Sequence, residues 1–582
     1  MLVASTCWFA RHPRVGIAIL ILAACPGGDP ATSEGTSTGS TSMGSTSTTT
    51  SGGTGEPTTD AVPTTGAVPT TSAVDPTTGS TTTGDLACEP MSVEPCYSGD
   101  PKTEGVGPCH AGTRTCDALG AGFGACEGEV VPQVDDCTTP EDEDCDGQLK
   151  LCPGEAYWAK RFGEAENQEP GALEVAADGT SVLVGSIQAT TDFGLGPIVS
   201  KGDYDMFVAK FAADGEPVWV RSIGSVQNQS GAGVAADGTG QIAVVGGFYD
   251  TVDFGGGPLT QEGFIDAYVA VFDADGAHVW SKGFGDTAHQ IAQDVAVTPA
   301  DEFVVTGTAA GTTDFGGGPL TSAGSEDHFI VKFTPGGEHV WSKLFGDAGE
   351  QSGEPKVEVQ ASGDIVAAGT FSSTIDFGSG PLPAAGLSDV YLTTLDGDGK
   401  AVWAKRFGDA AYQYVNDLDV DPASGRIVIV GAFEGKVDFG GGSLDSAGGL
   451  DLFAAVFEAD GAPVWSRRFG DGAKQSGMAT AFAVNGDILL SGSFDGTLDL
   501  GGDPLIGAGG EDMFLARLAA DDGTHVRSAR FGDTSYQRGY CLGHDGADNV
   551  FSAGMFGGTL SLGGIDLVSH GKADIHFSKL AF

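Results

Sequence analysis

Closely spaced carboxylates are the residues of this chain best suited to chemistry. Within residues 135–147, seven of thirteen side chains are Asp or Glu, and Asp142, Asp144 and Asp146 precede Gly147 in a D-x-D-x-D-G pattern. Alternate carboxylates around a glycine turn can converge on a hard cation such as calcium, which takes about six to eight oxygen ligands. An EF-hand would have Glu at the twelfth loop position, where this chain has Pro153. We expect either a calcium site of another kind or a solvated acidic loop.

A cysteine-rich segment, residues 86–152, contains this acidic run. Its eight cysteines are Cys88, Cys96, Cys109, Cys116, Cys126, Cys137, Cys145 and Cys152. An even number of cysteines at this density is typical of a small exported domain that disulfides hold together in place of a large core. The sequence does not choose among the many pairings. The absence of a Cys-x-x-Cys pair, with only His110 nearby, argues against zinc.

The stretch from Pro95 to Gly147 resembles the cysteine-rich metal-binding motif of myxobacterial surface proteins. The matching pieces are Gly105-Val-Gly-Pro-Cys109, Gly122-Phe-Gly-Ala-Cys126 and the Asp-Glu-Asp-Cys-Asp-Gly ending. The resemblance implies a metal-binding module, and a protein related by name binds copper in methanotrophs. Calcium is the ion that the carboxylates favour, and copper is the alternative. Metal capture is therefore one function class open to the chain.

The N-terminus has the pattern of an export signal. Arg11 and Arg14 flank the start of the apolar run Val15 to Ala24, which is too short to span about 30 Å of hydrocarbon. The run ends Leu22-Ala-Ala-Cys25, which resembles the lipobox of bacterial lipoproteins. In that family the signal is cut before the cysteine, which is then acylated. The resemblance implies a signal peptide over 1–24 and a lipid anchor at Cys25, with a plain secretory signal as the alternative.

Low-complexity sequence follows the cysteine. Of the 54 residues from 31 to 84, 29 are Ser or Thr and none is Lys or Arg. Such a segment has too little apolar surface to offset the entropy cost of ordering, so we expect residues 25–85 to be a disordered linker. Anchor and linker together predict an exported protein, tethered to the outer membrane or cell surface, whose membrane contact is the lipid.

The charge of the chain excludes two classes of partner. There are 79 Asp and Glu against 28 Lys and Arg, a formal net charge of −51. A protein this acidic has no basic patch to neutralise phosphates, so a nucleic-acid partner is excluded, as is binding to an anionic membrane through a basic face. The 40% of apolar residues is nevertheless enough to form a buried core.

From residue 153 onward one unit recurs seven times. Trp158, Trp219, Trp280, Trp341, Trp403 and Trp465 are 61 or 62 residues apart, and Arg527 occupies the seventh position. Two polar residues recur in every unit. The glutamines are Gln168, Gln229, Gln290, Gln351, Gln413, Gln475 and Gln537. The aspartates are Asp205, Asp266, Asp327, Asp389, Asp451, Asp512 and Asp574. A period of this length indicates a solenoid, a propeller or an array.

The local pattern of each unit favours a propeller. Four apolar runs are joined by short turns such as Asp178-Gly179 and Asp275-Gly276, a strong hairpin signal, so each unit is a four-stranded meander. Packing seven meanders around an axis covers their faces. We therefore predict an all-β fold, a seven-bladed β-propeller over 153–582. The last unit lacks a fourth strand, which the segment from Tyr157 to Phe162 can supply to close the ring.

The repeat resembles the bacterial β-propeller repeat family called SBBP. The resemblance lies in runs such as Asp327-His-Phe-Ile-Val-Lys, in the following Gly and Trp341, and in the Asp-Phe-Gly positions. It implies the propeller fold and is nearly silent on function. Arg527, Ile223 and Ser561 depart from the pattern. WD40 and kelch repeats are shorter and have other signatures.

Strand direction predicts where a site would lie. The repeated Gln, the Phe-Gly-Asp group and the Asp-Phe-Gly group should share one face of the ring. Residues present in every blade more often cap turns than bind ligand, although carboxylate rings can also hold cations or sugar hydroxyls. Five residues break the repetition: Tyr412, Tyr414, Tyr536, Arg538 and Tyr540.

We find no catalytic constellation in the sequence and expect no enzyme. The prediction is a surface lipoprotein that displays a propeller as a binding module for an unknown protein or glycan, with calcium as a structural ion. Two alternatives remain open. One is an extracellular polysaccharide hydrolase or lyase, which an asymmetric cluster of His, Arg and Tyr at one mouth of the ring would favour. The other is metal capture through residues 135–147.

Overall fold

A computed structural model describes residues 87–132, 154–351 and 353–582. The chain divides into two compact units, a small one ending at Gln133 and a large one that continues to Phe582. Each is described by itself. No helix of the described residues is long and apolar enough to cross a membrane. The predicted signal, anchor, linker and acidic loop, with Cys25, Asp142, Asp144 and Asp146, lie outside the described residues.

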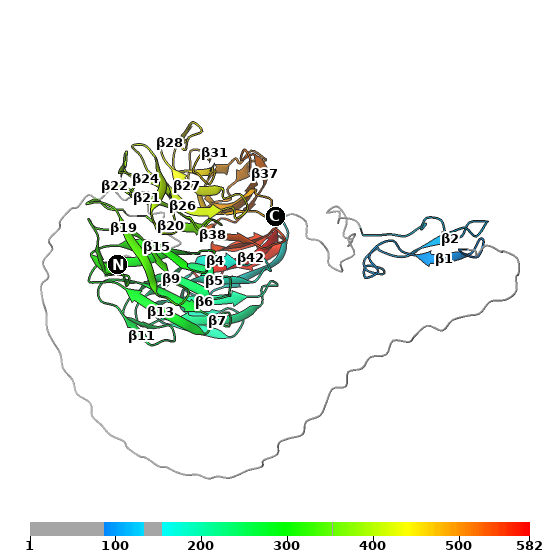
Figure 1. The fold of residues 1–582 in the computed structure, drawn as a ribbon, viewed down its shortest axis with the longest axis horizontal. Helices are drawn as coiled ribbons and strands as arrows, with labels where there is room; N and C mark the ends of the chain where they lie inside the picture. The colour runs from blue at the N-terminus through cyan, green and yellow to red at the C-terminus, as the bar shows by residue number, and fades with distance from the viewer. Residues whose placement is uncertain (1–86, 133–153, 352) are drawn as a thin grey trace, which may run out of the picture. The chain divides into compact units, whose positions relative to one another are not determined.

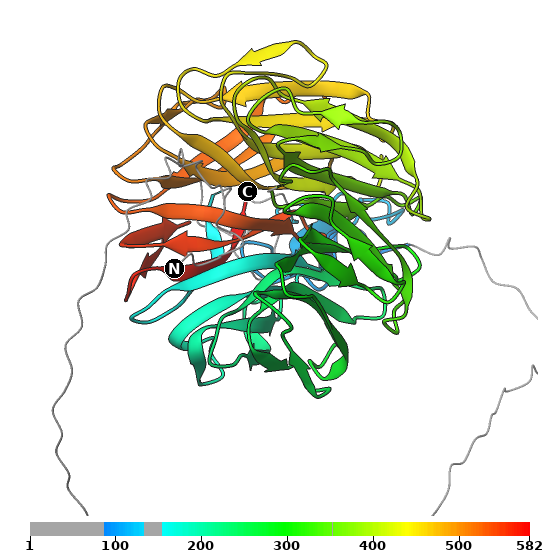
Figure 2. The same ribbon diagram turned by 90° about the vertical axis from the view of Figure 1, so that its left-hand side faces the viewer.

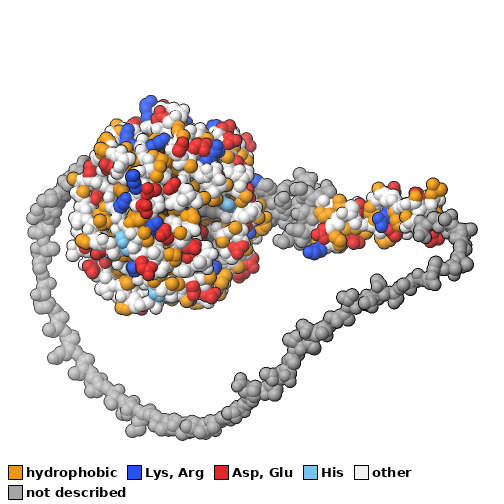
Figure 3. Space-filling model, in the orientation of Figure 1, with side chains coloured by type: hydrophobic (Ala, Val, Ile, Leu, Met, Phe, Trp, Pro, Cys, Tyr) orange, Lys and Arg blue, Asp and Glu red, His pale blue; other side chains and the backbone are white. Residues whose placement is uncertain are grey.

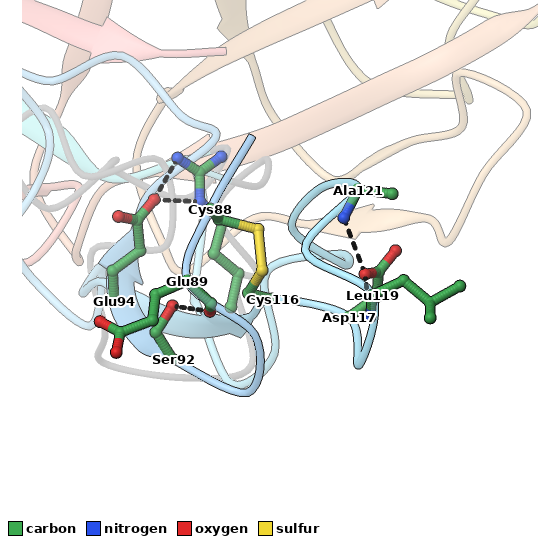
Figure 4. Close-up of a disulfide and its surroundings, with 9 residues drawn as sticks. Cys88, Glu89, Ser92, Glu94, Cys116, Asp117, Leu119 and Ala121 are labelled. Atoms are coloured by element: carbon green, nitrogen blue, oxygen red, sulfur yellow. Dashed lines mark hydrogen bonds and ion pairs between the residues drawn. A yellow bond between two sulfur atoms is a disulfide. The ribbon is translucent and has the colours of Figure 1, made fainter. Parts of the chain in front are cut away.

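The small unit contains one two-stranded antiparallel sheet, β1 (Val93–Cys96) and β2 (Gly112–Thr115). Two disulfides link the segments on either side, Cys88–Cys116 and Cys96–Cys126. Figure 4 shows the first of them beside the turn where Asp117 accepts the N–H groups of Leu119 and Ala121. Cys109 is also disulfide-bonded. A unit with so little sheet depends on its cross-links, as the cysteine content predicts.

The large unit is a seven-bladed β-propeller of four-stranded blades, which confirms the predicted fold class (Figures 1 and 2). The first strand of each blade contacts the first strand of the next, and the last contacts the first again, so these strands form a closed inner ring. They are β4 (Gln168–Val175), β8 (Gln229–Ala236), β14 (Gln290–Val297), β20 (Lys356–Val359), β26 (Gln413–Val420), β32 (Gln475–Phe482) and β38 (Gln537–His544).

The second and third strands of each blade are almost entirely buried, because apolar side chains cover both of their faces. The second strands are β5 (Ser181–Asp192), β9 (Ile242–Phe248), β15 (Phe303–Ala309), β21 (Ile365–Phe371), β27 (Ile427–Phe433), β33 (Ile488–Phe494) and β39 (Asn549–Phe556). The third strands are β6 (Pro197–Phe211), β12 (Asp266–Phe272), β18 (Asp327–Phe333), β24 (Asp389–Leu395), β30 (Asp451–Phe457), β36 (Asp512–Leu518) and β42 (Asp574–Ala581).

The fourth strands are the outermost and carry the repeated tryptophans. They are β7 (Pro217–Ile223), β13 (His278–Phe284), β19 (His339–Phe345), β25 (Ala401–Phe407), β31 (Pro463–Phe469), β37 (His525–Phe531) and β3 (Ala156–Phe162). β3 comes from the start of the unit and pairs antiparallel with β42, the last strand of the chain. The predicted closure of the ring is therefore confirmed. Figure 2 shows the first blade, in cyan, beside the last, in red.

A short β-ribbon joins the second and third strands of the blades. In the first blade it continues β5 and β6, and elsewhere it is a separate pair. The pairs are β10 (Thr251–Asp253) with β11 (Pro258–Thr260), β16 (Thr312–Asp314) with β17 (Pro319–Thr321), β22 (Thr374–Ile375) with β23 (Leu382–Pro383), β28 (Lys436–Asp438) with β29 (Ser443–Asp445), β34 (Thr497–Leu498) with β35 (Leu505–Ile506), and β40 (Thr559–Leu562) with β41 (Ile565–Val568).

In six of the seven blades, the tryptophan of the fourth strand packs on the following blade. The indole N–H of Trp465 donates to the carbonyl of Ala520, in the turn between the third and fourth strands of the following blade, at 3.0 Å. Its ring packs on Gly523, whose φ of 67° and lack of a side chain allow the close approach. The same contact recurs between Trp219 and Ala274. The repeated Trp is thus a packing residue.

Candidate functional site

The repeated glutamine ties together the connections on one face of the ring. In the sixth blade, the side-chain amide of Gln475 donates to Asp471, before β32, at 2.8 Å and to the carbonyl of Asp495, after β33, at 2.9 Å. The two connections therefore share a face, as predicted from strand direction; we call it the glutamine face. All seven glutamines are at most 1% exposed. Their side chains are structural links and leave little surface for a ligand.

The turn carboxylates, Asp286, Asp347, Asp409, Asp471 and Asp533, cap these connections. Asp471 accepts N–H groups from Ala473 at 2.8 Å and Thr497 at 2.9 Å in addition to the Gln475 amide. The Ala473 bond is the largest of the causes that hold the pKa of Asp471 below its ordinary value. Burial acts to raise the pKa of Asp286, Asp347 and Asp533, but their N–H donors outweigh it and these pKa values are also lowered. Backbone donors thus favour the ionised form of Asp286, Asp347, Asp471 and Asp533.

The repeated aspartates are at most 2% exposed and begin the third strands, except that Asp205 lies within the longer β6. One oxygen of each accepts the N–H of the residue four positions earlier, as Asp451 does from Ala447 at 2.6 Å. This hydrogen bond joins the segment that follows the ribbon to the third strand, so these aspartates are structural as well. In four blades an arginine of the fourth strand adds an ion pair, for example Arg468 to Asp451 at 2.7 Å.

Five carboxylates that are not part of the repeat lie on the inner ring: Glu174, Asp294, Glu358, Asp417 and Asp419. We call them the axial cluster. They belong to β4, β14, β20 and β26, and β4 is on the opposite side of the ring from β20 and β26. All five side chains are partly buried. Although Glu174 and Glu358 lie on opposite sides of the ring, the charge of Glu174 raises the pKa of Glu358. The carboxylates therefore interact electrostatically across the axis.

A β-bulge helps to aim two of these side chains. The pairing register of the inner strand shifts just before Asp294 in β14 and just before Asp417 in β26. Asp294 then accepts the N–H of Val357 on the next blade at 3.0 Å, and Asp417 accepts that of Thr480 at 2.8 Å. Asp419 accepts the N–H of Phe482 at 2.6 Å. Three members of the axial cluster therefore also join neighbouring inner strands.

Burial raises the pKa of every axial carboxylate. It brings the pKa of Glu174 to about 7, with Asp419 contributing, and the pKa of Asp417 to about 7. The pKa of Glu358 is raised well above its ordinary value, first by burial and then by four neighbouring carboxylates. The positive charge of Lys356 opposes the shifts at Asp294 and Asp417, and His544 opposes that at Asp419. The cluster is therefore partly protonated near neutral pH.

A charged network on the glutamine face breaks the repetition of the blades. It consists of Lys474, Glu511, Tyr536, Arg538 and Tyr540, from the sixth and seventh blades. Glu511 pairs with Lys474 at 3.0 Å and with the Arg538 guanidinium, which also donates to the Tyr540 hydroxyl at 3.1 Å. The guanidinium lies 5.8 Å from the centre of the Tyr536 ring. Burial acts to raise the pKa of Glu511, but Arg538 and Lys474 outweigh it and the pKa is lowered.

Two further aromatic residues lie on the same face at the fifth blade. The rings of Tyr412 and Tyr414 are nearly parallel, with centroids 5.8 Å apart, and both are partly exposed. In the seventh blade, the buried His576 contacts the carbonyl of Arg538 at 3.2 Å. Burial lowers the pKa of His576 to about 4, so this imidazole is neutral at pH 7. Of the residues that sequence reasoning singled out, Tyr536, Arg538 and Tyr540 are thus placed together, with the neutral His576 against the Arg538 backbone, and Tyr412 and Tyr414 form a separate pair.

Sequence reasoning missed the axial cluster. It found no catalytic constellation, whereas the structure brings together five acidic side chains from four blades. Their signal was a charged residue late in an inner strand, at positions where other blades have Ala or Gly, as in Ala235 and Gly543. Among the described residues, no group of three or more His, Cys, Asp or Glu side chains has the arrangement of a metal site.

Comparison with known proteins adds little. No family model matches the chain, and no curated protein matches it. Solved structures that resemble it include the WD40 β-propeller domain of Doa1, with 11% identity over 72% of this chain and 95% of that one, at a TM-score of 0.36. Another is the quinohemoprotein alcohol dehydrogenase of Comamonas testosteroni, with 11% identity over 72% and 76% and a TM-score of 0.36.

The β-propeller domain of the trilobed protease of Pyrococcus furiosus has 8% identity over 72% of this chain and 94% of that one, also with a TM-score of 0.36. These proteins differ from one another in activity, and likeness at this level carries no argument about what the chain does. The fold assignment rests on the strand pairing within the blades. The resemblance of the repeat to SBBP remains an expectation from its sequence.

Proposed function

We propose that this chain is an exported surface lipoprotein that displays its propeller as a binding module. The proposal rests on the lipobox-like ending at Cys25, the Ser/Thr-rich linker and a propeller whose repeated polar residues serve its own turns. Carboxylates are spread over the propeller face drawn in Figure 3, with only scattered Lys and Arg. That distribution suits a soluble display domain and disfavours polyanionic partners.

The observation that carries the proposal is the charged network on the glutamine face. Ligand sites break the symmetry of a repeat, and this network brings together side chains of both charges, outside the repeat, with aromatic rings. Arg538, Lys474 and Glu511 retain 14–22% of their side-chain surface, so they remain accessible from solvent. Hydrogen-bonding charges beside partly exposed tyrosines fit a polyhydroxylated ligand, because sugars offer hydroxyls to the charges and C–H faces to the rings. We propose an extracellular glycan as the ligand.

The test is binding of the full-length chain to a panel of immobilised neutral and uronic-acid polysaccharides. Arg538→Gln and Tyr412→Ala should each weaken binding about tenfold or more, since each removes a side chain on the glutamine face. Asp275→Ala, in a turn on the opposite face of the ring, is the matched control and should bind as the unmodified chain does. Equal binding by all three variants would contradict the location, and no binding by the unmodified chain would contradict the ligand class.

A polysaccharide lyase is the second candidate, because one observation favours it. The Tyr540 hydroxyl lies 3.1 Å from a guanidinium nitrogen of Arg538, so a tyrosine, a side chain that can act as a base, stands beside a cation that can bind a uronate carboxyl. Abstraction of the proton next to a uronate carboxyl would then expel the glycosidic oxygen and leave an unsaturated sugar. Unsaturated products that disappear in Tyr540→Phe would support the lyase, and binding without products would support the display module.

A further inference from the structure

In four blades an arginine neutralises the buried aspartate of the third strand. One guanidinium nitrogen donates both to the aspartate and to a glycine carbonyl just after the fourth strand. Arg468 is 2.7 Å from Asp451 and 3.1 Å from the Gly470 carbonyl. The equivalent arginines are Arg161, Arg406 and Arg530. A positive charge between a carboxylate and a carbonyl is therefore a standard part of these blades.

The first blade supplies the positive charge from another position. Ser222 has the place of the arginine, but the ammonium of Lys201, four residues before Asp205, reaches the Gly224 carbonyl at 3.1 Å. Its charge acts to lower the pKa of Asp205, although burial, the larger cause, leaves that pKa raised. The same location is thus filled by a cation from a different element.

The second blade has the same buried carboxylate and no cation. Asp266 is 2% exposed and forms no ion pair within residues 154–351 and 353–582. Its Oδ2 atom, which the guanidinium contacts in four other blades, accepts only the N–H of Glu262, at 2.8 Å, in the part of the chain described. Its Oδ1 atom has no hydrogen-bond partner there, as in all seven blades. An unpaired buried carboxylate is costly, and burial raises the pKa of Asp266.

Two substitutions in the second blade create space and add negative charge. Gly283 pairs with Tyr268 in the register that places Arg468 opposite Phe453, so the arginine position is empty of side chain. Glu262 occupies the position of Lys201 and therefore reverses its charge. The Asp266 carboxylate packs directly against Gly285, where a Cβ atom would come within 2.3 Å of Oδ1. Carboxylate and carbonyl oxygens are the ligands that calcium prefers.

We propose that the second blade binds one calcium ion between the Asp266 carboxylate and the Gly285 carbonyl. The ion takes the place that the guanidinium has in four other blades, and Glu262 and water complete its ligands. The third blade is the internal contrast. There Leu344 fills the arginine position and packs on the core, and Ala323 replaces Glu262. It lacks both the space and the second carboxylate. This site does not depend on whether the propeller binds a glycan.

The test is calorimetric titration of the chelator-treated, full-length chain with calcium chloride, alongside its melting temperature. Gly283→Arg should restore the guanidinium, raise the melting temperature in chelator and lose one bound calcium per chain. Asp266→Asn should lose the same calcium. Leu344→Arg is the matched control in the third blade and should leave the number of bound calcium ions unchanged. Calcium bound elsewhere, such as at residues 135–147, would be retained by all three variants.

Three results would overturn the proposal: no calcium bound by the unmodified chain, the same number of ions bound by Gly283→Arg as by the unmodified chain, or loss of an ion in Leu344→Arg as well. Gly283→Arg should fold normally, because the Arg–Asp ion pair that it introduces is already present in four other blades. Loss of calcium in this variant could therefore not be attributed to misfolding. Titration with magnesium and sodium checks the ion, and stabilisation by sodium alone would contradict the assignment to calcium.

Discussion

The turn carboxylates and the axial cluster are the same chemical group in opposite surroundings. Asp471 sits in a turn with three hydrogen-bond donors, and its pKa is lowered. Glu174 and Glu358 sit on the inner ring among other carboxylates, and their pKa values are raised. Backbone donors stabilise the ionised form in the first case, and burial with like charges destabilises it in the second. The position of a carboxylate in the blade therefore decides whether its charge stabilises the fold.

The largest effect should come from removing a turn carboxylate. Asp471→Ala takes the acceptor from Ala473, Thr497 and Gln475, so we expect the free energy of unfolding to fall by about 2 kcal/mol. Denaturant unfolding measures it. Asp471→Asn keeps one acceptor oxygen and should lose less. If the free energy of unfolding falls by less than about 0.5 kcal/mol, water replaces the carboxylate without cost. The claim that the turn carboxylates stabilise the fold would then be wrong.

The axial cluster should make stability fall as pH rises. The folded-state pKa of Glu174, about 7, lies above its unfolded value, so its contribution is fully present below about pH 4.5 and is lost as pH rises through 7. Glu174→Gln should therefore match the unmodified chain near pH 4.5 and be more stable by about 1–2 kcal/mol at pH 8, allowing for partial exposure. Melting temperature against pH measures this, and equal curves would contradict the raised pKa.

The turn carboxylates should respond to pH in the opposite sense. The pKa of Asp471 is lowered in the folded chain, so its contribution is present above about pH 4 and is lost as pH falls through its folded value. Asp471→Asn should therefore have a flatter acid limb in the same melting series. Glu174→Gln, which acts only on the alkaline limb, is its control.

A smaller effect should follow from removing the positive charge of the axial cluster. Lys356→Met takes away the charge that lowers the pKa of Asp294 and Asp417. We expect stability at pH 8 to fall by about 1 kcal/mol, with little change at pH 5, where the carboxylates are more protonated. Lys436→Met, on the outer ribbon, is the control and should show no pH dependence of its own. An equal loss at both pH values would indicate lost packing instead of lost charge.

The smallest effect should come from the ribbon carboxylates, which are hydrogen-bonded but exposed. Asp314 accepts the N–H groups of Gly316 at 2.8 Å and Gly318 at 2.9 Å in open solvent. Asp314→Ala should change the melting temperature by no more than about 2 °C. The seventh blade supports this, because it has Ser561 at this position and still forms its ribbon, β40 with β41. A large fall in melting temperature would show that the hydrogen bonds of Asp314 stabilise the fold despite their exposure to solvent.

The fold was largely predictable because it is repeated. Seven copies of a pattern average out the ambiguity of any one strand, and the lone strand at Tyr157 to Phe162 required a partner that only the last blade lacked. The repeated Gln and Asp were recognisable for the same reason, and so was their structural role. The axial cluster was not, since Glu174 and Asp419 occur once each and their sequence neighbours give no sign of a shared axis.

Periodic and local features could be read along the chain: seven blades, hairpin turns, capped connections and a cysteine-rich module. Only the tertiary structure decided which single residues meet. Closing the ring brings Glu174 near Glu358, though they are 184 positions apart. Secondary-structure propensity and turn chemistry act over a few residues, so they can be read along the chain. Electrostatic interactions depend on the distance between charges, and for residues far apart in the sequence that distance is set only when the ring closes.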